Sequence, residues 1–148
     1  MTGVQTCALP ISLGPSLVAA ALLVQPISWL SALPYPLSFY NPIVGGGSTA
    51  ERLILVGWGE GLDQVAAYLN AQPDAEVATI GVFYPLTVNF QALLRGTAIN
   101  LGGSTRPTYV VDYVNARQRA QTPSYVRDRM PDFVVRINGI DYARVYRT

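Results

Sequence analysis

Tyr109-Val110-Val111-Asp112-Tyr113-Val114 is a run of apolar and β-branched residues with a single charge, Asp112. Such a run predicts a strand in the middle of a sheet, where both faces are covered. On both sides of it, apolar runs alternate with apolar residues at helical spacing. We predict further strands over residues 52–57, 77–84 and 97–101, and helices through residues 62–69, 90–94 and 123–130.

The end of the chain predicts a β-hairpin. Residues 133–137 and 140–146 are strand-like, and Asn138-Gly139 between them supplies the positive φ values of a type I′ turn. Alternating strands and helices with short connections are typical of an α/β fold. We therefore predict a small Rossmann-like three-layer domain, whose mostly parallel sheet ends in an antiparallel hairpin, preceded by one transmembrane or apolar helix.

Charge divides the chain near residue 50, because all ten basic and nine acidic residues lie at or after Glu51. We divide the chain accordingly into residues 1–12, an apolar helix over residues 13–33, a Pro/Gly-rich juxtamembrane linker over residues 34–50, and an α/β domain over residues 51–148. The net charge of +1 gives little support to nucleic-acid binding, and none is predicted.

Residues 1–12 resemble the translation of a sequencing adapter, so we interpret them as an artefact and the remainder as a fragment that lacks its natural N-terminus. Cys7, the only cysteine, lies in this stretch, and the chain has no histidine. Thiolate and imidazole chemistry are thereby excluded from the remainder, as are cysteine and histidine metal sites. We predict no catalytic residue, no metal site and no cofactor.

Residues 13–33 predict a helix that crosses a membrane, because about 20 apolar helical residues span a bilayer core of about 30 Å. Pro26 kinks such a helix without forbidding it. Trp29, Tyr35, Phe39 and Tyr40 follow at the place where aromatic rings favour the membrane interface. The alternatives are a core helix, which should carry a polar stripe, and a signal peptide, which should carry a basic region and a cleavage site.

One motif in the chain has the form of a ligand-binding turn, Gly57-Trp58-Gly59-Glu60-Gly61. Its glycine spacing resembles the first motif of S-adenosylmethionine-dependent methyltransferases, and a helix N-terminus after it favours anions. Two features oppose cofactor binding: Glu60 brings a negative charge to the turn, and Phe83-Tyr84-Pro85 replaces the acidic residue expected after the next strand. The alternative is a tight structural turn, which we favour.

Charged residues of the second half suggest two weaker sites. Asp112 within its apolar strand is predicted to pair with an arginine, such as Arg52 or Arg144, rather than to act in catalysis. A group of arginines makes this half locally basic and offers contacts to acidic headgroups or pyrophosphate, with a solvated helix face as the alternative. Its members are Arg117, Arg119, Arg127 and Arg129.

Three strings together are similar to the C-terminal part of family 39-type membrane glycosyltransferases, which are related to dolichyl-phosphate-mannose protein mannosyltransferases. They are Phe39-Tyr40-Asn41-Pro42-Ile43-Val44-Gly45-Gly46, Val56-Gly57-Trp58-Gly59-Glu60-Gly61-Leu62-Asp63-Gln64 and Ile137-Asn138-Gly139-Ile140-Asp141-Tyr142-Ala143. The resemblance runs from about Ser16 to the end. It implies a parent enzyme that moves a sugar from a polyprenyl-phosphate donor to an acceptor.

The same resemblance implies that residues 13–33 are the last membrane span, in contact with the lipid bilayer and with a missing N-terminal transmembrane domain. Residues 51–148 would then form a domain on the extracytoplasmic side of the cell membrane. The acidic catalytic loop of such enzymes lies near the N-terminus, so we predict no transferase activity for this chain. Its expected role is to support the membrane domain or acceptor binding. The alternatives are a membrane-anchored or secreted interaction domain and a small nucleotide- or S-adenosylmethionine-binding enzyme domain.

Overall fold

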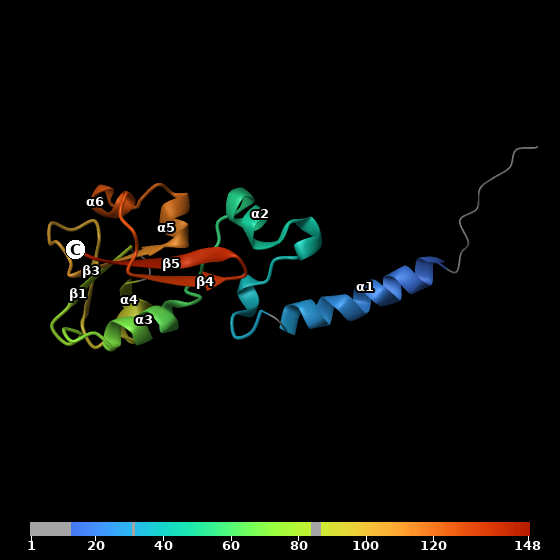
Figure 1. Ribbon diagram of the computed structural model, residues 1–148, viewed down its shortest axis with the longest axis horizontal. Coiled ribbons are helices and arrows are strands. Elements are labelled where there is room, and N and C mark those ends of the chain that lie inside the picture. Colours follow the sequence, from blue (N-terminus) through green and yellow to red (C-terminus); the bar gives the residue numbers. More distant parts are fainter. Residues whose placement is uncertain (1–12, 31, 84–86) are drawn as a thin grey trace, which may run out of the picture.

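The computed structural model describes residues 13–30, 32–83 and 87–148, and its centre is a five-stranded mixed sheet (Figure 1). The strand order is β2-β1-β3-β5-β4. β1 pairs in parallel with β2 and β3, whereas β5 pairs antiparallel with β3 and β4. The α/β class is therefore confirmed. The strand bounds are β1 Thr79–Val82, β2 Thr97–Asn100, β3 Tyr109–Tyr113, β4 Phe133–Ile137 and β5 Ile140–Arg147.

β3 is the central strand, as predicted, and all five of its residues are buried. Its side chains alternate between the two faces of the sheet. Tyr109, Val111 and Tyr113 belong to the main core. Val110 lies on the opposite face and packs against Val126. Asp112, two residues after Val110, lies on that opposite face as well.

Helices cover both faces of the sheet (Figure 1). On the main-core face lie α3, Leu62–Asn70, and α4, Thr87–Gln91. α3 has the predicted helical spacing, because its buried side chains recur every three or four residues, at Leu62, Val65 and Leu69. On the other face lie α5, Val114–Gln118, and α6, Ser124–Arg127. α5 was not predicted, and α6 is shorter than the predicted helix over residues 123–130.

The C-terminal hairpin is confirmed. β4 and β5 are joined by Asn138 and Gly139, whose φ angles are 48° and 81°. Both angles are positive, as the type I′ turn requires. The register shifts between Val135 and Arg136: Val135 pairs with Ala143 and Arg136 with Asp141, so Tyr142 is the extra residue of a β-bulge in β5.

The strand predicted over residues 52–57 is wrong. Residues Gly46–Leu53 form helix α2, and residues 54–57 run on without strand pairing. Leu53, Ile54 and Leu55 are more than half exposed, and only Val56 and Gly57 of this run are buried. The prediction equated an apolar run with a buried one, and here the run lies at the surface.

The predicted linker contains more structure than its composition indicates. Two short 3₁₀ helices, Pro36–Ser38 and Pro42–Val44, precede α2, and α2 continues across residue 50. Ser38 is fully buried, and the Asn138 side chain donates a hydrogen bond of 2.8 Å to its carbonyl oxygen. This segment therefore packs against the tip of the hairpin.

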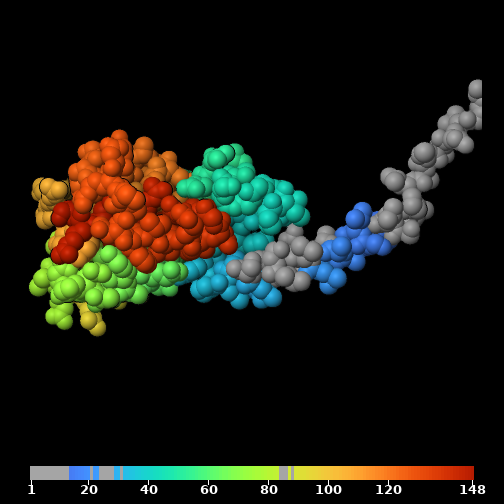
Figure 2. Space-filling model, in the orientation of Figure 1, coloured from blue at the N-terminus to red at the C-terminus, as the bar shows by residue number. Residues whose placement is uncertain are grey.

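Helix α1, Leu13–Leu30, extends away from the sheet and its covering helices (Figures 1 and 2). Its exposed side chains include Leu17, Leu22 and Leu23. Across the described residues, no helix has both the length and the apolar character needed to cross a membrane. The membrane span predicted over residues 13–33 is therefore not found among the described residues.

Candidate functional site

The predicted ligand-binding turn, residues 57–61, connects the irregular segment after α2 to α3, so helix rather than strand precedes it. Gly57, Gly59 and Gly61 have φ angles of 91°, 122° and 79°. A Cβ at Gly57 would lie 2.4 Å from Val114 Cγ1, and one at Gly61 would lie 2.7 Å from Val135 Cγ1. Both glycines are thus required by close packing as well as by backbone conformation.

The backbone N–H groups of this turn already have acceptors within the protein. The Trp58 N–H donates to Glu60 Oε2 at 2.6 Å, and the Gly59 N–H donates to the Tyr113 hydroxyl at 2.9 Å. A phosphate group at this turn would need those same donors. The carboxylate of Glu60 thus occupies a place that an anionic ligand would take. These contacts favour the structural turn over cofactor binding.

Three side chains from the end of β3 and from α5 hold the segment that includes this turn: Tyr113, Asn115 and Gln118. We call them the clamp residues. The Tyr113 hydroxyl donates to the Glu60 carbonyl oxygen at 3.0 Å, and Asn115 Nδ2 donates to the Gly57 carbonyl oxygen at 3.2 Å. Burial is the main cause that raises the pKa of Tyr113, so its hydroxyl keeps the proton that it donates.

Gln118 makes three hydrogen bonds to the backbone of the segment before the turn. Its Nε2 donates to the carbonyl oxygens of Glu51 and Ile54 at 2.6 and 2.8 Å, and its Oε1 accepts from the Val56 N–H at 3.0 Å. These bonds supply backbone partners that a neighbouring strand would otherwise supply. The sequence analysis missed the clamp residues, because their partners lie more than fifty positions away.

A hollow of about 300 Å³ adjoins the turn, and we call it the Trp58 hollow. The Trp58 side chain is 81% exposed. Within the described part of the chain, the side chains of Asn89 and Arg119 form no hydrogen bond or ion pair. Indole, amide and guanidinium groups are therefore available to a ligand here. The lining residues are Leu55, Val56, Gly57, Trp58, Asn89, Asn115 and Arg119.

Asp112 is buried, but it does not form the arginine ion pair that we predicted. Thr122 Oγ1 donates to its carboxylate at 3.0 Å. Arg144 lies opposite Asp112 in the β3–β5 register, yet its guanidinium pairs with Asp141 at 2.9 Å. Arg52 forms no ion pair with Asp112. Burial is the main cause that raises the pKa of Asp112, and nearby arginines and the Thr122 hydrogen bond lower it.

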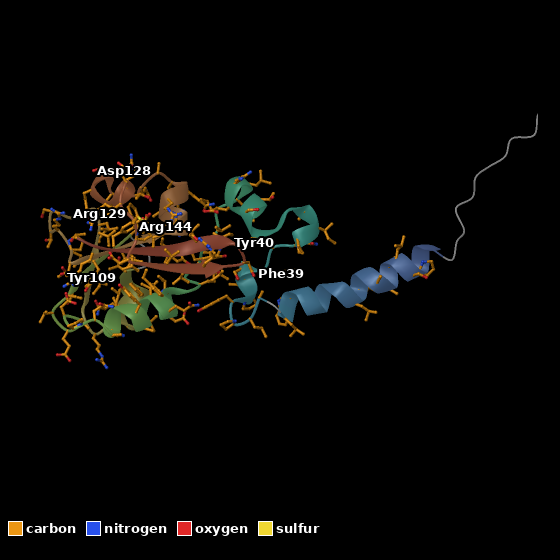
Figure 3. The ribbon with its side chains drawn as sticks, viewed as in Figure 1. Phe39, Tyr40, Tyr109, Asp128, Arg129 and Arg144 are labelled. Atoms are coloured by element: carbon orange, nitrogen blue, oxygen red, sulfur yellow. The ribbon has the colours of Figure 1, made fainter. Side chains whose placement is uncertain are left out.

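A second hollow of about 300 Å³ opens over Asp112, and we call it the arginine hollow. Its lining residues are Asp112, Arg117, Ala120, Thr122, Arg127, Arg144 and Tyr146. Of the four arginines that made this half basic in sequence, Arg117 and Arg127 line it, whereas Arg119 lines the Trp58 hollow and Arg129 lines neither. Figure 3 shows Arg144 on β5, below α5 and α6 in this view, and labels Arg129 close to α6.

The described residues contain no group of three or more aspartate, glutamate, histidine or cysteine side chains that would hold a metal ion. Comparison with protein-family models, with curated proteins and with solved structures finds no match for this chain.

Proposed function

We propose that this chain is the non-catalytic C-terminal domain of a membrane glycosyltransferase that uses a polyprenyl-phosphate-linked sugar. In this proposal the Rossmann-like α/β part lies on the extracytoplasmic side and supports the membrane domain or acceptor binding. The observation that carries the proposal is a concentration of exposed apolar side chains at the end of the domain from which α1 leaves.

This surface, which we call the apolar end, lies over the two 3₁₀ helices, α2 and the segment that follows it. Figure 1 places these elements at the end of the domain nearest α1. Contiguous apolar patches of more than a few hundred Å² are rare on soluble monomers and mark interaction surfaces. The exposed large apolar residues of the apolar end are Leu33, Leu37, Ile43, Val44, Leu53, Ile54, Leu55 and Trp58.

The distribution of charge agrees with an apolar partner. No charged residue precedes Glu51, so the part of the apolar end before α2 carries no ionised side chain. Beyond Trp58, by contrast, the exposed large apolar residues of the described chain are scattered singly, at Val77, Leu93, Tyr125 and Met130. Isolated exposed apolar side chains are ordinary on a protein surface. The apolar end differs because several such side chains lie on neighbouring elements.

Residues just before the first string of the family resemblance contact the other two strings. The hydroxyl of Tyr35 donates to Asp63 at 2.7 Å, and Gln64 donates back to that hydroxyl at 2.9 Å. Asn138 at the hairpin tip binds the backbone of Ser38, immediately before the first string. These contacts join the base of α1 to α3 and to the hairpin. They support a role in fixing the α/β domain relative to α1 and to the proposed membrane domain.

An interaction domain unrelated to glycosyl transfer would use the same apolar end, so the first experiment separates these two proposals. Long-read sequencing of the source DNA recovers what precedes Leu13. A reading frame that continues upstream through repeated apolar spans and an acidic loop supports the glycosyltransferase. A start codon within about thirty codons, followed by basic residues, supports a small anchored or exported domain.

A second experiment tests the apolar end in the recovered full-length protein. Leu53→Asp places a charge on this surface, and Val77→Asp places one on an exposed apolar residue elsewhere, which makes it a matched control. We expect Leu53→Asp to reduce sugar transfer from the polyprenyl-phosphate donor or the yield of folded enzyme, and Val77→Asp to leave both unchanged. Equal behaviour of the two variants would contradict the proposal, as would turnover by the 148-residue chain alone.

A further inference from the structure

The arginine hollow carries more positive than negative charge. Guanidinium groups of Arg117, Arg127 and Arg144 line it, and the only carboxylate among its lining residues is that of Asp112. Two hydroxyl groups, from Thr122 and Tyr146, complete the polar lining. The hollow lies on the face of the sheet away from the main core, and the residues come from β3, α5, α6, β5 and the loop between the two helices.

The contacts of the three arginines show that two of them, Arg117 and Arg127, form no ion pair among the described residues. Arg117 donates only to backbone carbonyl oxygens, to that of Asp112 at 2.7 Å and to that of Asp141. Arg127 donates to the Thr122 carbonyl oxygen at 3.3 Å and forms no ion pair within the described residues. Only Arg144 has a carboxylate partner, Asp141, which it shares with Arg136.

A partly buried guanidinium without a carboxylate partner is costly, because burial removes water that would stabilise its charge. Arg117 forms no direct ion pair with a carboxylate: burial is the main cause that lowers its pKa and Arg144 lowers it further, whereas the nearby carboxylates of Asp112, Glu51 and Asp141 raise it. An anion in the hollow would supply the missing countercharge. Arginine is also the residue whose planar donors best match the oxygens of phosphate.

We propose that the arginine hollow binds a phosphate-bearing anion, either a free phosphate monoester or the phosphate headgroup of a lipid. Arg117 and Arg127 contact the phosphate oxygens, and Arg144 and the Tyr146 hydroxyl lie nearby. The Thr122 hydroxyl donates to Asp112 and not to the phosphate. The Asp112 carboxylate weakens binding through repulsion and holds Thr122 in place. This proposal does not depend on the proposed function, since it concerns a different face of the domain.

The test uses the complete 148-residue chain labelled with ¹⁵N, with inorganic phosphate as the probe and chloride at matched ionic strength as the reference. We expect phosphate to shift the amide signals of Ala120 and Thr122 and to leave the distant indole signal of Trp58 unchanged. Arg127→Gln removes an exposed charge at the hollow, and we expect it to weaken binding about tenfold, the equivalent of one lost charge-assisted hydrogen bond.

Two further variants keep the test specific. Arg129→Gln removes a neighbouring exposed arginine that does not line the hollow, and we expect its affinity for phosphate to equal that of the wild type. Asp112→Asn removes the opposing carboxylate while keeping its shape, and we expect several-fold tighter binding. A residue group with only a structural role would not show opposite effects from Arg127→Gln and Asp112→Asn, which both change lining residues.

A second arm separates the two sources of phosphate by sedimentation with phosphatidylcholine vesicles, with and without phosphatidic acid. Amide shifts with inorganic phosphate indicate a soluble ligand, and sedimentation that requires phosphatidic acid and Arg127 indicates a lipid headgroup. Either result supports the site. The proposal is overturned if neither probe binds, or if Arg129→Gln weakens binding as much as Arg127→Gln.

Discussion

Replacing Gly61 by alanine tests whether the glycines of the predicted turn are there for packing or for a ligand. Gly61 has a φ of 79°, and a Cβ at this position would lie 2.7 Å from Val135 Cγ1 and 3.2 Å from Ile137 Cδ1. Gly139 provides a matched control, because its φ is 81° and nothing lies within 4 Å of its added Cβ. The two substitutions therefore share the backbone strain and differ in steric contact.

The expected cost follows from these two contributions. An alanine in the left-handed region costs about 1–2 kcal/mol, which is the whole cost expected for Gly139→Ala. At Gly61 the methyl group must also displace Val135, a core side chain that is 1% exposed. Overpacking of this kind adds about 1–3 kcal/mol, so Gly61→Ala should destabilise the fold by about 2–5 kcal/mol.

Urea unfolding of the 148-residue chain, followed by far-UV circular dichroism, measures both free energies. If Gly61 is required for packing, we expect the free energy of unfolding of Gly61→Ala to be lower than that of Gly139→Ala by at least about 1 kcal/mol. Equal losses from the two variants would refute it, because steric contact with the hairpin would then cost nothing. A ligand role for Gly61 would instead appear as lost binding of a nucleoside or S-adenosylmethionine, with no difference in stability.

Two further predictions concern the clamp residues and the buried carboxylate. Gln118→Ala removes three hydrogen bonds to the backbone of residues 51–56, and we expect it to lower the free energy of unfolding in urea by about 1–3 kcal/mol. Gln121→Ala, at an exposed position, is the control and should leave this free energy almost unchanged. Similar losses for both variants would contradict the role of Gln118 as a clamp residue. Burial raises the pKa of Asp112 above its ordinary 3.8, so the folded state holds this proton more tightly than the unfolded state. The stability that the bound proton contributes is complete below pH 3.8 and is lost as the pH rises through the raised pKa. Asp112→Asn should remove this fall in stability with rising pH. Parallel profiles of the free energy of unfolding against pH for the variant and the wild type would contradict the prediction.

The sequence predicts those elements of the fold whose structure is decided by nearby residues. α3 was predictable because Leu62, Val65 and Leu69 recur at helical spacing, and the same three side chains enter the main core. The hairpin was predictable because only residues that tolerate positive φ suit its turn, and Asn138-Gly139 is such a pair. Local chemistry alone fixes both elements.

The failed predictions concern residues whose structure depends on distant partners. The apolar run at residues 52–57 has the composition of a strand, but Gln118 binds its backbone from a position 62 residues beyond Val56. α2 begins with Gly46 and Gly47, which oppose helix formation locally. Gly47 fits only as glycine, because a Cβ there would lie 2.4 Å from the Asn138 carbonyl oxygen. Tertiary contact with the hairpin thus decides the local structure.

The candidate sites divide in the same way. The glycine spacing of residues 57–61 indicated a turn, but spacing does not show that the N–H groups of Trp58 and Gly59 already have protein acceptors. The basic character of the second half was visible in the sequence. Which arginines meet is set by the fold, since β5 brings Arg144 opposite Asp112 across the sheet.

The clamp residues connect the apolar end of the domain to the arginine hollow. Tyr113 ends β3, and Asn115 and Gln118 lie in α5. Their side chains hold the backbone of the turn and of the segment before it. Arg117, in the same short helix, reaches the other face and lines the arginine hollow. A partner that presses on the apolar end would therefore act on α5 through Gln118, and α5 carries a residue of the second hollow. If both proposals hold, a partner bound at the apolar end should change the amide signals of Ala120 and Thr122, and Gln118→Ala should abolish that change.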